Sequence, residues 1–210
     1  MSLTFINSSL SLILSTEGMI MAMSPEPMSP VSQEAAGRLR RISRWARAFS
    51  YVAAALMLFG LIWLWTDAEA LSHYARSSIG LGGAALAASG RGYWLAFALA
   101  WIPAGLFVLA MVRLGGLFRA FGEGRVLVEE NAAGLVRIGW LLAWFGATTP
   151  IVRALQSVAL TFDNPQGQRH LAITLDPGIF AALAAAAALI AFGHVLREAI
   201  RLADENQSFV

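Results

Sequence analysis

The sequence predicts an all-α integral membrane protein: a four-transmembrane-helix bundle with both termini in the cytoplasm. Of its 210 residues, 58% are hydrophobic and 13% are charged, whereas soluble domains are about 45–50% apolar and about 25% charged. Four runs are almost free of charge, and each is close to the length that crosses a hydrocarbon core of about 30 Å. Arginines concentrate beside alternate ends of these runs, as the positive-inside rule describes for cytoplasmic segments.

Residues 1–32 are expected to form a disordered leader, or to follow from a start site assigned too far upstream. This stretch is rich in Ser, Met and Pro, and Asn7, Ser8 and Ser9 interrupt its one mildly apolar part. It lacks the basic segment with which a cleaved signal peptide begins. Residues 33–210 are expected to form a single membrane domain.

The first span is predicted at residues 48–66. The run is uncharged for 19 residues, which corresponds to about 28 Å of helix. Trp63 and Trp65 near its end are expected at the membrane interface, where tryptophan is enriched. Five arginines precede the span and place that flank in the cytoplasm: Arg38, Arg40, Arg41, Arg44 and Arg47.

Residues 67–92 are expected to be an external connection, because frequent glycines prevent them from spanning the membrane. The second span is predicted at residues 93–113. Its small residues recur at every fourth position, which favours close helix contact in lipid: Ala96, Ala100 and Ala104. Pro103 is expected to kink this helix, because proline lacks an N–H and crowds the preceding turn.

A polar turn around Gly122, Glu123 and Gly124 is expected to end the second helix, and the next helix is expected to begin near Val128. Glu129 and Glu130 then fall in a first helical turn, where exposed amides favour carboxylates. The neighbouring arginines, which are expected to surround these acidic side chains, are Arg119, Arg125 and Arg137.

The third span is predicted at residues 137–155, with a kink at Thr148, Thr149 and Pro150. Arg153 lies near its outer end. Its long stem favours an interface anchor that reaches outward, and the alternative is a buried functional charge.

Residues 161–177 are expected to form a second external loop, extended around 170–175, and the alanine-rich fourth span is predicted at residues 178–196. With four spans and cytoplasmic termini, eleven of the fifteen arginines lie inside. The four that lie outside are Arg76, Arg91, Arg153 and Arg169.

The sequence contains few of the residues that form disulfides, metal sites or cofactor sites. It has no cysteine, which excludes disulfides and thiolate metal sites. His73 and His170 lie in external segments without metal-site spacing, so neither a metal nor any other cofactor is expected. The basic excess sits beside apolar runs, so it indicates contact with anionic lipid rather than direct binding of nucleic acid.

The strongest candidate site is a cluster that forms at the cytoplasmic surface if the third and fourth helices are neighbours. An inter-helix charge network that pins the bundle is the favoured interpretation, since ion pairs are often structural. Docking of a partner is the next, and catalysis is the least favoured. The cluster comprises Glu129, Glu130, Asn131, Arg137, His194, Arg197, Glu198, Arg201 and Glu205.

Residues 121–140 and 191–206 resemble the bacterial membrane proteins of domain-of-unknown-function family 2975. The likeness rests on a G-x-x-x-x-E-E-N turn from Gly124 to Asn131, and on a final helix that ends in R-E-x-x-x-L-x-x-E-N. It extends over roughly residues 40–210 and implies four spans. Val128 stands where the family often has a Ser or Thr cap, and Ser208-Phe209-Val210 replaces its usual Leu-Thr-Val ending.

Family members are often encoded beside a small helix-turn-helix regulator, so the resemblance implies regulation without naming an activity. We therefore expect a non-enzymatic, multi-pass regulatory or adaptor protein of the bacterial inner membrane. Its expected partners are the lipid bilayer and a helix-turn-helix regulator docked on the cytoplasmic face, with a homo-oligomer left open. The alternative is a small transporter or ligand-binding membrane bundle.

Overall fold

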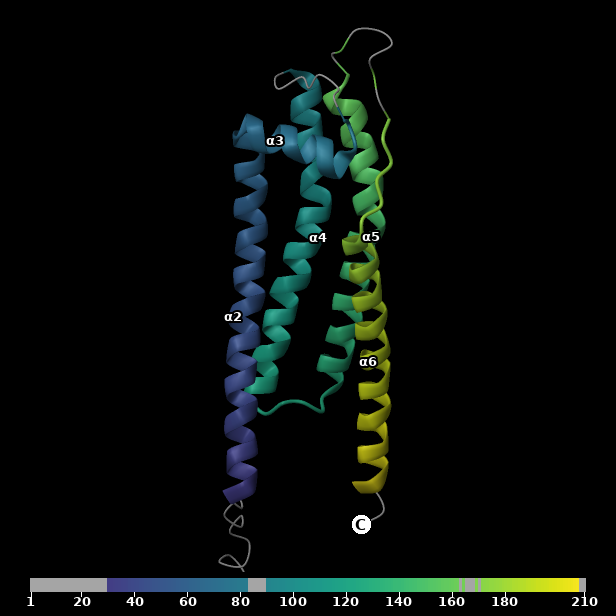
Figure 1. Ribbon diagram of the computed structural model, residues 1–210. Helices are drawn as coiled ribbons and strands as arrows, with labels where there is room; N and C mark the ends of the chain where they lie inside the picture. The colour runs from purple at the N-terminus through teal and green to yellow at the C-terminus, as the bar shows by residue number, and fades with distance from the viewer. Residues whose placement is uncertain (1–29, 83–89, 163, 165–168, 170, 208–210) are drawn as a thin grey trace, which may run out of the picture. The chain divides into compact units, whose positions relative to one another are not determined.

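The computed structural model describes residues 30–82, 90–162, 164, 169 and 171–207, and the regular structure in these residues is helical. The chain divides between Arg38 and Leu39 into two units, and the account below concerns the second. The helices are α2 (Pro30–Thr66), α3 (Ala68–Tyr74), the π-helix η1 (Ala75–Ile79), α4 (Arg91–Gly122), α5 (Glu129–Leu160) and α6 (Pro177–Gln207) (Figure 1).

Four of these helices are long and apolar enough to cross a membrane, and each contains one of the predicted spans. The candidate spans are Gly37–Thr66, Arg91–Gly122, Glu129–Leu160 and Pro177–Glu205. A helix of about 30 residues is about 45 Å long, so it exceeds the hydrocarbon core of about 30 Å. The predicted spans are shorter than the helices because arginine and glutamate end the uncharged run but not the helix.

Successive long helices run in opposite directions, which gives the bundle two distinct ends (Figure 1). We call one the turn end, because it carries the α4–α5 turn at residues 123–128 and the last part of α6. The other is the α3 end, which carries α3, η1 and the segment before α6. The predicted leader lies almost wholly outside the described residues, and α2 begins at Pro30, slightly before the expected domain boundary.

The outer face of α2 is covered with large apolar side chains. They recur at alternating intervals of three and four residues, and each is at least half exposed. Such a stripe is what a spanning helix presents to acyl chains rather than to water. Its members are Ile42, Trp45, Phe49, Val52, Leu56, Phe59 and Trp63.

Helices α5 and α6 pack against each other through glycine. A Cβ atom added to Gly139 would lie 2.6 Å from Ile190 Cγ1 and 2.9 Å from Ala186 O, and one added to Gly193 would lie 2.6 Å from Val136 Cγ2. Without side chains at these positions the two backbones approach closely, which is how helices associate in lipid. Gly146 repeats the arrangement seven residues after Gly139, against Leu183.

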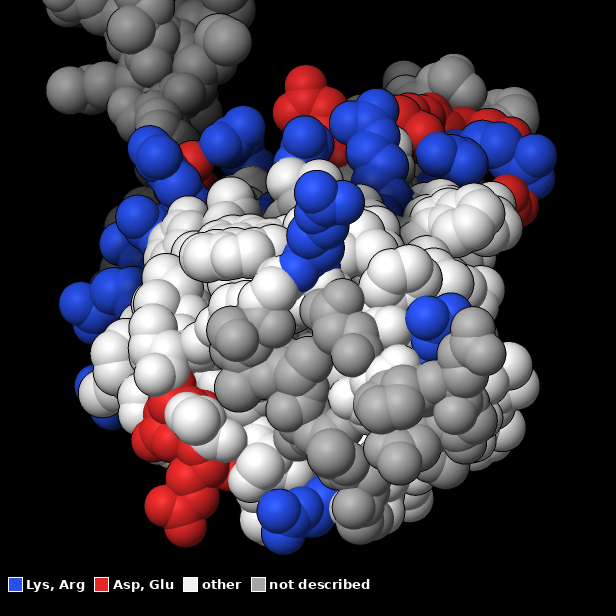
Figure 2. All heavy atoms as spheres, turned by 90° about the horizontal axis from the view of Figure 1, so that it is seen from above, with Lys and Arg blue, Asp and Glu red and all other residues white. Residues whose placement is uncertain are grey.

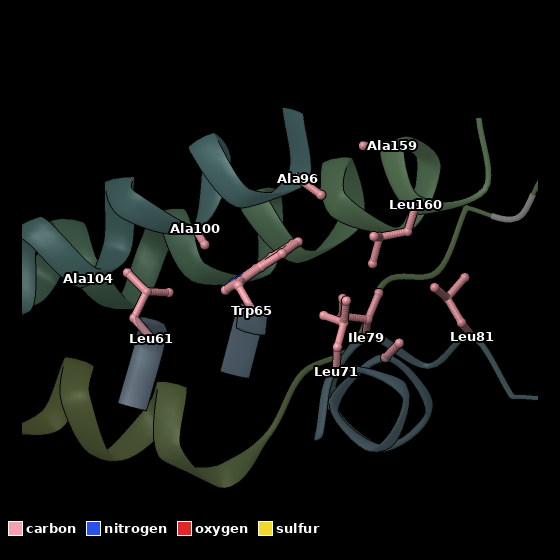
Figure 3. Close-up of a cluster of buried hydrophobic side chains, with 11 residues drawn as sticks. Leu61, Trp65, Leu71, Ile79, Leu81, Ala96, Ala100, Ala104, Ala159 and Leu160 are labelled. Carbon is pink, nitrogen blue, oxygen red and sulfur yellow. The ribbon is translucent and has the colours of Figure 1, made fainter. Parts of the chain in front are cut away.

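A second packing centre lies near the α3 end, between α2 and α4. Ala96, Ala100 and Ala104 are buried there, as their four-residue spacing predicts, and they form one apolar cluster with Leu61 and Trp65 (Figure 3). The prediction for Trp65 was wrong: its side chain is only 5% exposed. It is buried because the small side chains of α4 leave room for the indole, whereas Trp63 lies on the outer face.

The connection after α2 is helical, which the sequence analysis missed. Asp67 caps α3 by accepting hydrogen bonds from the backbone of Glu69 (2.9 Å) and Ala70 (3.1 Å), and α3 with η1 lies across the end of the bundle (Figure 1). The sequence contains the pattern that identifies it, since apolar residues at four-residue spacing predict a helix face. That buried face consists of Leu71, Ala75 and Ile79.

The segment from Leu171 to Asp176 is extended, as expected, and it follows α5 back toward the start of α6. Its burial alternates, with Ala172, Thr174 and Asp176 turned inward. Ala172 N donates to Ser157 Oγ of α5 at 3.0 Å, and Thr174 Oγ1 donates to Ile79 O of η1 at 3.0 Å. These bonds hold the segment against two helices and thereby fix the position of Asp176.

Candidate functional site

The α4–α5 turn is built around Glu123, whose carboxylate lies between two arginines as predicted. Arg119 Nε donates to Glu123 Oε1 at 2.9 Å, and Arg125 Nη2 donates to Glu123 Oε2 at 2.6 Å. These hydrogen bonds, with that from Arg125 the stronger influence, hold the pKa of Glu123 below its ordinary value. Gly124 has φ = +83°, in the left-handed region that favours glycine.

Asn131 closes this turn from within. Its side chain is buried, and Nδ2 donates to Arg125 O and Val126 O, the latter at 3.2 Å. Helix α5 begins after Val128, and no side chain caps it because valine has no hydrogen-bonding group. Glu129 and Glu130 occupy its first turn. Asn131 thus shapes the turn from a buried position.

One ion pair joins the turn to the last part of α6. Arg197 Nε lies 2.7 Å from Glu129 Oε1, and the two side chains are 45% and 59% exposed. Arg201 instead pairs within α6, with Glu198 at 2.6 Å and Glu205 at 3.6 Å. The structure therefore brings Glu129 and Arg197 together, while Arg201 and Glu130 do not pair with each other.

The remaining members of the predicted cluster lie apart from this pair. Glu130 and Arg137 face Arg113 across a hollow of about 200 Å³ between α4 and α5. His194 is exposed on α6, one turn before Arg197, and forms no ion pair with any described residue. An exposed ion pair such as Glu129–Arg197 stabilises a fold by only about 0.2–1 kcal/mol. The cluster is therefore a charged surface held by weak contacts.

A different arrangement surrounds Arg153 near the α3 end. Its side chain is 17% exposed, and Nη1 donates to Asp176 Oδ2. Arg153 was expected to reach outward as an interface anchor, and in the structure its guanidinium pairs with the carboxylate of Asp176, whose side chain is 36% exposed. The cause is the extended segment 171–176, which returns along α5 and brings Asp176 beside it.

Asp176 also begins α6. Its Oδ1 accepts a hydrogen bond from Ile179 N at 3.3 Å, so the carboxylate caps the helix at the end where backbone amides favour negative charge. The bond from Arg153, followed by its charge and by these amides, holds the pKa of Asp176 below its ordinary value. The pair thus connects the last part of α5 to the start of α6.

Beside Arg153 lies a hollow of about 270 Å³, which we call the Arg153 hollow. Hydrocarbon side chains of α2, α4 and α5 form most of its wall. Its polar members besides Arg153 are Tyr74, Thr149 and Gln156. Tyr74 Oη donates to Gln156 Oε1 at 3.4 Å, and Gln156 Nε2 donates to Ala96 O at 3.0 Å. Burial raises the pKa of the Tyr74 phenol, although the charge of Arg153 opposes this.

Two buried side-chain nitrogens among the described residues have no hydrogen-bond partner: Arg153 Nε and Trp65 Nε1. Both residues line the Arg153 hollow. A buried donor without a partner lowers the stability of a fold by about 1–3 kcal/mol, and two such donors belong to residues of the same hollow. Such a combination of perturbed polar groups and an apolar concavity is the usual mark of a binding site.

The sequence analysis named Arg153 but not its surroundings. The signal for it was a lone arginine within a predicted span, which is expensive in lipid and therefore a candidate functional residue. Tyr74 and Asp176 were placed in loops, and Gln156 was passed over. The described residues contain no group of three metal-ligating side chains, and His170 lies outside the described residues.

Viewed onto the α3 end, a few separate arginine and acidic side chains lie on the described near surface, and a band of both kinds appears along the upper edge of the view (Figure 2). No curated protein and no solved structure matches the chain. A family model does match, that of a "Protein of unknown function (DUF2975)", over residues 87–210. The match covers α4, α5 and α6 but not α2 and α3, so it is shorter than the likeness expected from residue 40. Because it covers more than half of the chain, the protein belongs to the DUF2975 family, whose function is unknown.

Proposed function

We propose that this chain is a non-enzymatic regulatory or adaptor protein of the bacterial inner membrane. Its turn end faces the cytoplasm and receives a soluble helix-turn-helix regulator. The observation that carries the proposal is the Glu129–Arg197 pair, at 2.7 Å. It marks where α6 passes the start of α5, and α6 continues from Arg197 for ten further residues to Gln207. This places a charged helical surface beyond the α4–α5 turn (Figure 1).

The orientation rests on the distribution of arginine. The turn end carries Arg113, Arg119, Arg125, Arg137 and Arg197, close to the ends of spans. Positive residues near span ends are retained in the cytoplasm. The same side also offers attraction to anionic lipid head groups, which makes the bilayer surface the first partner of these arginines.

The chemistry of the turn end suits docking better than catalysis. Its carboxylates are exposed, and the ones at Glu123, Glu129 and Glu198 each pair with arginine. A general acid or base needs a shielded site that moves its pKa toward neutrality. Exposed pairs instead provide complementary charge, which determines the specificity and rate of association more than its strength.

The proposed contact is the α6 tail surface, formed by exposed side chains of the last turns of the helix. Acidic and basic groups alternate on it around one apolar residue, which gives a partner both charge and a hydrophobic contact. The surface comprises Glu198, Arg201, Leu202 and Glu205.

A binding experiment with exchanged charges tests this proposal. The chain is placed in lipid nanodiscs, and binding of the helix-turn-helix protein encoded by the neighbouring reading frame is measured. The double variant Glu198→Arg and Arg201→Glu keeps an ion pair between positions 198 and 201, although it removes the contact of Arg201 with Glu205, and it reverses the charges that a partner meets. We expect at least tenfold weaker binding, because facing like charges repel.

The matched control is Arg76→Glu, which changes one exposed charge at the α3 end and should leave binding unchanged. Equal losses in both variants would mean that the effect is not specific to the α6 tail surface. Unchanged binding in the double variant, or a neighbouring frame that encodes no such regulator, would reject the adaptor role.

A second candidate function is a ligand-binding membrane bundle, or a small transporter built on one. The specific observation that favours it is the Arg153 hollow, at about 270 Å³ with Pro103 of α4 in its wall. Proline within a membrane helix marks a place where the backbone can bend. The two candidate functions use opposite ends of the bundle, so they can be tested separately.

A further inference from the structure

We propose that the Arg153 hollow binds an amphiphilic anion, that is, a carboxylate or phosphate head group carried on an apolar chain. This goes beyond the adaptor role at the turn end, and it rests on the ligand-binding candidate, whose ligand it identifies by chemical class. The head group lies at Arg153, and the chain lies along α2 toward the middle of the span.

The anionic head group is inferred from Arg153, the one charged side chain among the residues that line the hollow. Arg153 presents five N–H donors in a planar fork. One nitrogen, Nη1, donates to Asp176, while Nε is buried without a partner. Carboxylates and phosphates match this fork with two oxygens at once, so the guanidinium can bind an oxyanion in addition to Asp176.

Asp176 does not preclude a second anion. Its carboxylate also accepts from the backbone of Ile179 at the start of α6, and helix-terminal amides stabilise negative charge independently of Arg153. The guanidinium can therefore be shared between Asp176 and a bound head group. Gln156 lines the same hollow, and the Nε2 hydrogen that does not bond Ala96 O can donate to a head-group oxygen.

The apolar chain of the ligand is inferred from the other residues that line the Arg153 hollow. Met57, Leu61 and Leu64 of α2 face Ala100 and Pro103 of α4 across the hollow. Lining residues of α2 extend from Leu56 to Trp65, a distance of about 13 Å along the helix axis. A cavity of about 150 Å³ with apolar walls accepts benzene, so 270 Å³ accommodates a head group with several carbons of a chain.

An anion is expected to bind more tightly than a neutral ligand because the charged group, Arg153, lines a mainly apolar hollow. Arginine stays protonated even when buried, and the interaction of two charges grows as the dielectric of their surroundings falls. In a hollow walled mainly by hydrocarbon, an opposite charge gains more than it would in water.

Calorimetric titration of the full chain in nonionic detergent tests the proposal, with octanoate as the probe. Octanol has the same chain without the charge and controls for partition into micelles. We expect octanoate to bind at least tenfold more tightly than octanol, and to raise the unfolding temperature. A second titration adds dihexanoyl-phosphatidylglycerol as a competitor of octanoate. Displacement of octanoate by this phospholipid would indicate that the natural ligand is a bilayer lipid, and no displacement would indicate a free acid.

Two helix glycines supply a variant and its control. A Cβ atom meets nothing within 4 Å at either Gly60 or Gly105, but only Gly60 lines the Arg153 hollow. Gly60→Leu should fill the hollow and abolish octanoate binding, while Gly105→Leu should retain it. Neither change touches the Arg153–Asp176 pair, so loss of binding cannot be confused with loss of that contact.

A further variant tests the charge. Arg153→Gln combined with Asp176→Asn removes the pair without leaving a buried charge unpaired, and it should reduce the octanoate preference over octanol to less than twofold. If octanol binds as tightly as octanoate to the parent chain, the hollow takes ligands but not anions, and the assignment of ligand class fails alone. If neither probe binds, or if Gly60→Leu binds octanoate as the parent does, the ligand-binding candidate fails with it.

Discussion

Substituting Gly139 by alanine should separate α5 from α6. The added Cβ would lie 2.6 Å from Ile190 Cγ1 and 2.9 Å from the backbone oxygen of Ala186. Carbon atoms pack at about 3.5–4.0 Å, so the isoleucine carbon would have to move by about 0.9 Å or more. The side chain can rotate away, but the backbone oxygen moves only if the helices shift.

The expected cost follows from two opposing effects. Overpacking of a close contact costs about 1–3 kcal/mol, and replacement of a helix glycine by alanine returns about 0.5–1 kcal/mol. The net loss of unfolding free energy for Gly139→Ala is therefore between about 0 and about 2.5 kcal/mol. Adding Ile190→Ala should recover only the part of the loss that is due to the isoleucine side chain.

The measurement is the unfolding of the purified chain in mixed micelles of dodecyl sulfate and a nonionic detergent, followed by circular dichroism. Gly134→Ala, in the same helix, is the control, because its Cβ would meet only Leu117 Cδ1 at an ordinary 3.7 Å. The control should be stabilised by about 0.5–1 kcal/mol. Equal transition midpoints for Gly139→Ala and Gly134→Ala would show that α5 and α6 do not approach as closely as described.

Three further predictions concern the turn, the Arg153–Asp176 pair and the orientation. Asn131→Ala removes two hydrogen bonds from the turn and should lower the unfolding free energy by about 1–2 kcal/mol; an equal effect of Glu130→Ala, at the exposed neighbour, would contradict this. Because Arg153 lowers the pKa of Asp176, the pair's contribution is present above the unfolded pKa of about 3.9 and is lost as the pH falls through the lower, folded value. Thermal unfolding between pH 6 and pH 2 should show this decline in the parent but not in Asp176→Asn, and parallel curves would refute it. A reporter active only outside the cytoplasm should give signal when fused after Ser89 and none after Glu123; the reverse result would invert the topology.

Much of the turn could be predicted from sequence because its contacts are local. Glu123 pairs with residues two and four positions away, and the glycine at 124 and the carboxylates at 129 and 130 mark the end of one helix and the start of another. The pairs of Arg201 within α6 are likewise set by helical spacing of three and four residues. Only the Glu129–Arg197 contact required that α5 and α6 be neighbours, which was the condition that the sequence analysis set for the cluster.

The surroundings of Arg153 could not be predicted in the same way. Its carboxylate partner lies 23 residues further along the chain, and Tyr74 and Trp65 come from elements that precede the family match. Nothing in the spacing of these residues indicates that they meet. The burial of Trp65 was likewise decided by the small side chains opposite it on α4, since the same residue beside a larger one would lie at the interface.

The sequence by itself therefore determined the four long apolar helices, their approximate limits and the chemistry of the turn. These features depend on composition and on neighbours within one or two helical turns, because lipid imposes a length and a charge rule on each span separately. The tertiary structure alone decided that the segment 171–176 returns along α5, that Asp176 meets Arg153, and that a hollow forms beside them. Those outcomes depend on how closely helices pack, which is set by side-chain shape across interfaces rather than by any property of one helix.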